Sequence, residues 1–245
     1  MVNRQITPLS IMNYIPKKAM VVFAHPDDAE IGAGGSAALW ALNGCEITYI
    51  QCTDGSNGSN DKKMTSENIT KIRSEEQKEA AKLIGVRNYI HFNYMDGGLI
   101  DNKEFLSQMV EVIRKYRPEV IFTHDPFRMD GFQHRDHRIT GIIVQDAVYP
   151  FSRDHLHFPE QIKKGLKTHK VKSVLYWGAD KPNCIIDISN SIETKIESLS
   201  KHQSQLPGLS YGSETAKRIR NRSSDSAQKH DFKYGEVFRK LDARV

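Results

Sequence analysis

Short apolar segments with the length of buried strands alternate with helical segments along the first half of the chain. The apolar segments are nearly continuous, as in the strands of a parallel sheet that is covered on both faces. Glycine or proline follows each helical segment and ends it. This order predicts strands at 19–24, 46–53, 87–92 and 119–124, and helices at about 34–43, 66–84 and 103–116. We therefore expect an α/β fold with a Rossmann-like, mostly parallel sheet, flanking helices and right-handed crossovers.

The alternation loosens after about residue 149. Residues 154–169 are predicted to be irregular or partly helical, and two further strands are expected at 171–179 and 183–189, as antiparallel additions to the sheet. A helix is expected over 189–205, and the polar segment from 212 onward is predicted to be helical. We expect a single domain over 1–245, with a core of about 19–205 and a C-terminal helical extension of about 206–245.

Composition excludes several classes of protein. Hydrophobic residues make up 38% and charged residues 27% of the 245-residue chain, and the mean hydropathy is −0.55, as in a soluble globular protein. No apolar run approaches the roughly 18 residues that span a membrane. The N-terminus has no apolar core of a signal peptide, so we expect a cytoplasmic protein. The three cysteines form no CxxC pair, which argues against disulfides and a thiolate zinc site.

Two clusters of imidazole and carboxylate side chains stand far apart in the sequence. HPDD (25–28) follows the first predicted strand, and HRDH (134–137) follows the fourth. Ligands bind outside the carboxyl ends of the strands in open α/β sheets, so the two clusters can share one site. Imidazole and carboxylate ligands without thiolates suit a catalytic zinc ion with three protein ligands and one open position. We therefore expect one Zn²⁺ per chain.

The spacing within each cluster suggests separate roles. A tight turn lets His25 and Asp28 face one point, while Asp27 stands beside the metal, where a carboxylate can take a proton from water. His134 and His137 are three residues apart, so a helix that begins near them lets one bind the metal while the other stays free. The residues alone do not decide which of the two histidines is the ligand.

His124 and Asp125 fall at the end of the fourth predicted strand. They border the same cleft, where they can orient the metal ligands.

With these motifs, the chain resembles the PIG-L/LmbE-like deacetylases, which remove acetyl from N-acetylglucosaminyl conjugates. The matching segments occur in the family's order from about Ala19 to Gln205: AHPDDAEIGAGG (24–35), TDG (53–55), RSEEQKEAAKLIGV (73–86), YMDGGL (94–99), HRDHR (134–138) and KHQSQ (201–205). One position departs from the pattern, because the second metal motif often reads HPDH and this chain has Arg135. The arginine makes that turn less rigid and adds a positive charge near the site without removing a ligand.

The resemblance implies a role for each matched residue. It implies that His25, Asp28 and His137 are the zinc ligands and that Asp27 is the general base. His134 matches the histidine that stabilises the oxyanion or protonates the leaving amine, and Asp136 matches the carboxylate that orients this histidine. The positions that match contacts to the sugar, or that lie near the site in relatives, are Arg73, Asp96 and His202.

The sequence thus predicts a zinc-dependent hydrolase that removes acetyl from an N-acetylated amino sugar or its conjugate. The expected partner is this small-molecule substrate, with no nucleic acid and no membrane, and the C-terminal segment could pack between copies in a homo-oligomer. The main alternative is a metal-dependent amidase that acts on a thiol-sugar conjugate or another small amide. A dinucleotide-binding domain is disfavoured because GAGGSA lacks the GxGxxG spacing. A nucleic-acid-binding protein is disfavoured because the lysines and arginines behind the net charge of +5 are dispersed.

Overall fold

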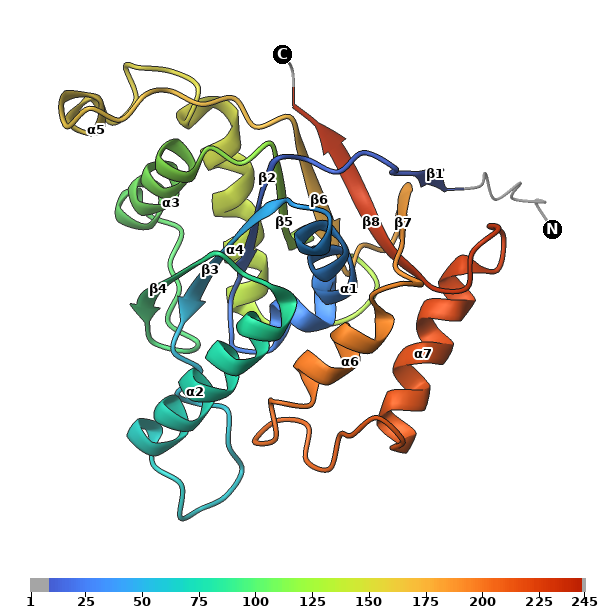
Figure 1. The fold of residues 1–245 in the computed structure, drawn as a ribbon. Helices are drawn as coiled ribbons and strands as arrows, with labels where there is room; N and C mark the ends of the chain where they lie inside the picture. Colours follow the sequence, from blue (N-terminus) through green and yellow to red (C-terminus); the bar gives the residue numbers. More distant parts are fainter. Residues whose placement is uncertain (1–8, 244–245) are drawn as a thin grey trace.

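The apolar strands of the first half pair in parallel and form one side of an eight-stranded sheet (Figure 1). The computed structural model describes residues 9–243, so residues 1–8 and 244–245 of the expected single domain lie outside the described part. The strand order is β1-β7-β8-β6-β5-β2-β3-β4. The strands are β1 (Ser10–Ile11), β2 (Lys18–Phe23), β3 (Glu46–Thr53), β4 (Asn88–Tyr94), β5 (Val120–His124), β6 (Ser173–Trp177), β7 (Cys184–Asp187) and β8 (Gly235–Asp242).

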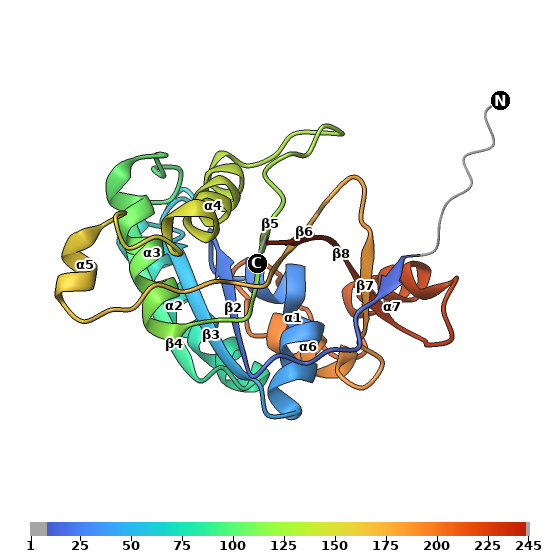
Figure 2. The same cartoon turned by 90° about the horizontal axis from the view of Figure 1, so that it is seen from above.

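Helices cover both faces of the sheet (Figure 2). One apolar core lies between the sheet and α1, α2, α6 and α7, and the other lies between the sheet and α3, α4 and η1. Side chains alternate between the two cores along β2, so Val21 enters the first core and Met20 the second. The helices are α1 (Asp28–Leu42), α2 (Ser66–Ile84), α3 (Lys103–Tyr116), α4 (Arg135–Asp146), the π-helical turn η1 (Ala147–Phe151), α5 (Pro159–Lys163), α6 (Ile192–Leu199) and α7 (Glu214–Ala227).

Local sequence signals set the ends of the central helices. The Thr65 side chain accepts a hydrogen bond from the Asn68 amide and begins α2, and Gly85 ends this helix in the left-handed conformation, with φ 85°. Asn102 caps α3 in the same way through the Phe105 amide. The predicted mostly parallel α/β fold with flanking helices is confirmed by this topology.

The C-terminal segment differs from the expected helical extension. Residues 214–227 form α7 as predicted, but residues 235–242 form β8, which pairs antiparallel with both β6 and β7. The prediction of further helix was wrong because strand β8 is stabilised by two distant partners that local periodicity does not reveal. The strand expected at 171–179 is present as β6, but the expected antiparallel addition to the sheet was wrong, because β6 pairs parallel with β5. None of the described helices is long and apolar enough to cross a membrane.

Helix α1 begins earlier than predicted, at Asp28 instead of about Gly34. Asp27 makes this possible by adopting φ 93°, a left-handed conformation that turns the chain from the end of β2 directly into the helix. The early start places the two aspartates of HPDD at the beginning of α1, beside the carboxyl end of the sheet.

Candidate active site

The two sequence clusters meet at the carboxyl end of the sheet, where the strand order reverses. From β2 the chain proceeds to β3 and β4 on one side, and β5 then pairs with β2 on the other side. Such a switch point is the usual ligand site of an open α/β sheet. His25 follows β2, His124 ends β5, and His134 is the residue that precedes α4.

The potential metal-ligand atoms of three residues converge at this point. His25 Nδ1 lies 3.2 Å from Asp28 Oδ2 and 3.1 Å from His137 Nε2, and His137 Nε2 lies 3.2 Å from Asp28 Oδ1. A tetrahedral zinc ion with bonds of about 2.0–2.1 Å holds its ligand atoms about 3.3–3.4 Å apart. The spacing of the two nitrogens and the Asp28 carboxylate therefore fits one zinc ion held by the three residues, with a fourth position left open.

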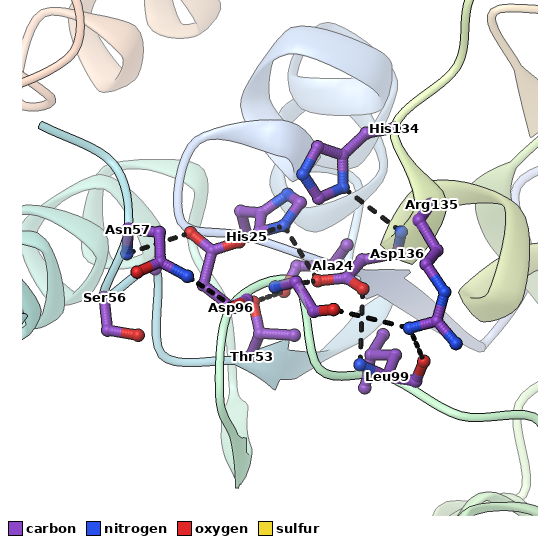
Figure 3. A network of polar contacts seen from close by, with 12 residues as sticks. Ala24, His25, Thr53, Ser56, Asn57, Asp96, Leu99, His134, Arg135 and Asp136 are labelled. Atoms are coloured by element: carbon purple, nitrogen blue, oxygen red, sulfur yellow. Dashed lines mark hydrogen bonds and ion pairs between the residues drawn. The ribbon is translucent and has the colours of Figure 1, made fainter. Parts of the chain in front are cut away.

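Two carboxylates fix the orientation of the His25 ring (Figure 3). His25 Nε2 lies 3.1 Å from Asp96 Oδ1 and 3.3 Å from Asp136 Oδ2. In the neutral ring these acceptors hold the proton on Nε2 and direct the lone pair of Nδ1 toward Asp28 and His137. Burial lowers the pKa of His25, but hydrogen bonds to Asp136, Asp28 and Asp96 outweigh it and raise the pKa to about 11. The carboxylates thus strongly favour positive charge at this point, as a cation site requires.

Another combination of neighbouring donors, Asp28, His124 and His137, fits a metal less well. His124 stacks on His137 with ring centroids 4.0 Å apart and lies 3.4 Å from Asp28. Its Nδ1 accepts a hydrogen bond from Trp177 Nε1 at 3.1 Å, which uses the single lone pair of the neutral ring and leaves the proton on Nε2, the nitrogen that faces Asp28. His124 therefore has no lone pair left for a metal. Burial lowers the pKa of His124 to about 4, so the ring is neutral and orients Asp28.

Asp27 stands next to the three convergent ligands without joining them. Burial and the negative charge of Asp28 raise the pKa of Asp27 to about 7, while Arg73 opposes this rise. A carboxylate with a pKa near neutral is suited to both accept and return a proton. The Asp27 amide donates to Gln77 Oε1 at 2.9 Å, and Gln77 Nε2 donates to the buried Glu30 at 3.0 Å. This chain of contacts holds Asp27 in its left-handed conformation.

His134 and Asp136 have different partners from those that the resemblance implied. His134 Nδ1 accepts a hydrogen bond from the Asp136 amide at 3.1 Å, and its ring packs edge-on against His25 with centroids 4.5 Å apart. The Asp136 carboxylate accepts from the Gly97 and Leu99 amides and faces His25 instead of His134. Partial burial and the charge of His25 lower the pKa of His134. His134 therefore presents a neutral ring with the proton on Nε2, whereas the resemblance implies a histidine oriented by the Asp136 carboxylate.

The three residues that we expected at the sugar are all buried. Arg73 is buried and donates to the carbonyl oxygens of Pro26 and Gly55. Asp96 is buried against His25. The His202 side chain has 0% exposure, lies 3.3 Å from Glu30, and is near enough to Asp27 for its charge to lower the pKa of that carboxylate. A contact between His202 and the sugar stays a prediction.

Four residues of the site had no role in the sequence-based interpretation. Gln77 and Glu30 support Asp27, and Trp177 orients His124. The backbone amide of Asn57 donates a hydrogen bond to the Asp96 carboxylate at 3.3 Å. Each lies in an ordinary-looking position of a helix, strand or loop, so only the approach of distant segments identifies it.

The comparisons with known proteins show the family of this chain. The sequence signature of the PIG-L family, described as GlcNAc-PI de-N-acetylase, matches residues 20–148. The chain is 32% identical over 191 residues to diacetylchitobiose deacetylase of Thermococcus kodakarensis, a match that covers 78% of this chain and 71% of that protein. It is 27% identical over 213 residues to a probable N-acetyl-α-D-glucosaminyl L-malate deacetylase 2 of Bacillus cereus, covering 85% of this chain and 91% of that protein.

A solved structure shares the whole architecture. The N,N'-diacetylchitobiose deacetylase from Pyrococcus horikoshii in complex with its inhibitor MPG superimposes with a TM-score of 0.84 at 30% identity, covering 92% of this chain and 84% of that one. The chain therefore belongs to the PIG-L family, and it is an N-deacetylase with a potential His/Asp metal site.

Proposed function

We propose that the protein is a zinc-dependent hydrolase that removes acetyl from an N-acetylated amino sugar or its conjugate. The observation that carries the proposal is the convergence of His25, Asp28 and His137 within 3.1–3.2 Å of one another, with Asp27 adjacent. The named relatives, which are deacetylases of diacetylchitobiose and of a glucosaminyl malate, support the substrate class. One Zn²⁺ per chain fits this set of ligands.

Zinc held by these three residues would polarise the acetyl carbonyl and lower the pKa of a coordinated water toward about 7. Asp27 takes a proton from the attacking water and later donates it to the departing amine, so that acetate and a free amino sugar leave. The neutral His134 ring donates from Nε2 to the oxygen that becomes negatively charged in the tetrahedral intermediate. Asp136 keeps His25 in the ligand orientation. Arg73, Asp96 and His202 remain the proposed contacts for the sugar, since Arg73 and His202 act on Asp27 and Asp96 contacts His25.

A metal assay combined with acetate release from a panel of N-acetyl sugars tests the proposal. The zinc-loaded protein should release acetate, and a chelator should abolish the activity until zinc is restored. Asp27→Ala should keep the zinc and lose about 10²–10⁴-fold in kcat, whereas His137→Ala should lose both. Turnover by Asp27→Ala at the wild-type rate would overturn the assignment of the base. Release of an acid other than acetate would favour an amidase that acts on another conjugate.

A further inference from the structure

The segment after β4 carries Asp96 to the metal site in a tight turn. The Gly98 amide donates a hydrogen bond to the Met95 carbonyl oxygen at 2.9 Å, and Gly97 has φ 79°, which suits the third residue of a type II turn. Asp96 is the second residue of this turn, and its carboxylate reaches His25 Nε2 at 3.1 Å. Because the turn sets the direction of this carboxylate, any group that fixes the turn also fixes a contact to a proposed zinc ligand.

Two adjacent side chains at the beginning of α4 bind the backbone of this turn (Figure 3). Asp136 accepts hydrogen bonds from the Gly97 amide at 2.7 Å and from the Leu99 amide at 3.3 Å. Arg135 donates from Nη1 to the carbonyl oxygens of the same two residues, at 3.3 Å to Gly97 and at 2.5 Å to Leu99. The N–H and the C=O of both residues are therefore held by α4.

The Arg135 guanidinium has no other role that the structure shows. The residue is exposed, and within residues 9–243 its side chain has no carboxylate within 4.0 Å and donates to no other acceptor. Arg135 is also the position at which the chain departs from the HPDH pattern. A proline there has no side-chain donor, so the arginine adds two contacts to the turn that a proline could not make.

The loop after β3 holds the same turn from a second direction. The Asn57 backbone amide donates to the Asp96 carboxylate at 3.3 Å, and Asn57 Nδ2 donates to the Asp96 carbonyl oxygen at 2.7 Å. The Asp96 amide donates to Asp54 Oδ1 at 3.0 Å. These contacts persist when Arg135 is replaced, so we expect the turn to loosen without unfolding.

We propose that Arg135 is a positioning residue of the metal site, which acts through the turn at 95–98 by directing the Asp96 carboxylate to His25 Nε2. The inference rests on the proposed zinc site and adds to it a residue that touches neither the metal nor the substrate. A carboxylate at the second ring nitrogen orients a metal-ligating histidine and increases its basicity. Loss of the Arg135 contacts therefore weakens zinc binding although all three zinc ligands remain in the chain.

The test measures the zinc affinity of the full chain by competition with a chromophoric chelator. Arg135→Gln and Arg135→Pro should each weaken zinc binding by about 3–10-fold, at the lower end of the range for groups that orient a ligating histidine, because the loop after β3 still holds the turn. Arg135→Pro keeps the beginning of the helix, since the position is the first of α4 and His134 has φ −56° and ψ 138°, which suit a residue before proline. The urea midpoint of the metal-free variants should match that of the wild type.

An Asp96→Ala background separates positioning from a general structural effect. Because Arg135 acts through Asp96, most of the loss caused by Arg135→Gln should disappear in this background. Arg138→Gln is the matched control, since Arg138 is an exposed arginine of the same helix whose side chain has no hydrogen bond or ion pair within residues 9–243. It should leave the zinc affinity unchanged.

Three outcomes would overturn the positioning role. The first is wild-type zinc affinity in both Arg135 variants, and the second is an equal loss with and without Asp96→Ala. In either case the wild type still binds zinc, so the proposed function stands. The third is a wild type that does not compete with the chelator for zinc, which would refute the proposed zinc site and the positioning role together.

Discussion

The role of Asp136 gives the sharpest test of the site, because two assignments predict different results. The structure directs its carboxylate to His25 Nε2 at 3.3 Å, whereas the resemblance assigns it to His134. Asp136→Asn should therefore weaken zinc binding. Loss of a carboxylate that orients a metal-ligating histidine typically costs 10–100-fold in metal affinity, which is about 1.4–2.7 kcal/mol.

The structure narrows this range. Asp96 Oδ1 lies 3.1 Å from the same nitrogen of His25 and still holds the proton on Nε2 when Asp136 is replaced. We therefore expect a loss of about tenfold for Asp136→Asn, and a loss nearer 100-fold when Asp96→Asn is added. The Gly97 amide donates a hydrogen bond to Asp136 at 2.7 Å, and the side-chain oxygen of asparagine can still accept this hydrogen bond.

Competition with a chromophoric chelator measures the zinc affinity directly and does not depend on turnover. Asp125→Asn is the matched control, because Asp125 is equally buried but pairs with Arg239 and not with a metal ligand. It should leave the zinc affinity within about twofold of the wild type, since it changes no group around His25. Unchanged zinc affinity in Asp136→Asn, together with a reduced kcat, would refute our reasoning. It would indicate that Asp136 orients His134, as the resemblance implies.

Three further predictions concern stability and can be read from urea unfolding. Arg114 has 1% exposure and donates six hydrogen bonds to the segment that follows α4, so Arg114→Met should lower the free energy of unfolding by about 3–5 kcal/mol; a loss under about 1 kcal/mol would contradict this. Lys195→Met should cost about 3–5 kcal/mol, because it leaves the Glu236 carboxylate buried without its cation, and a smaller loss in Lys195→Met with Glu236→Gln would confirm the cause. The pKa of Glu119 is lowered from the ordinary 4.5 to about 2. Burial alone would raise this pKa, but hydrogen bonds from Lys172, Tyr14 and the Lys17 amide outweigh the effect of burial. Because the folded pKa lies below the unfolded one, this stabilisation is complete above about pH 4.5 and is lost as the pH falls toward 2. Solvent screening limits it to about 1 kcal/mol, and the stability difference between wild type and Glu119→Gln should shrink between pH 6 and pH 3.

Much of the central fold could be predicted from local sequence. The strand at 46–53 and the helices at 66–84 and 103–116 have the predicted bounds, because apolar periodicity, a capping side chain and a terminating residue all act within a few positions. The segment from 235 to 242 was predicted to be helical and is a strand. Its Phe238 enters the core only because β6 and β7 offer open edges on either side, and a strand paired at both edges depends on contacts that no local window contains.

The site divides in the same way. The sequence by itself determined which chemical groups are present: two imidazoles and a carboxylate suited to zinc, and a second carboxylate beside them. Only the tertiary structure decided what each group does, since the tautomer of a histidine and the pKa of an aspartate depend on the atoms around them. The Asp136 carboxylate thus faces His25 instead of His134, and His202 is buried beside Glu30. The partners of these side chains come from segments brought together by the sheet, and their distances are set by packing, which sequence spacing does not encode.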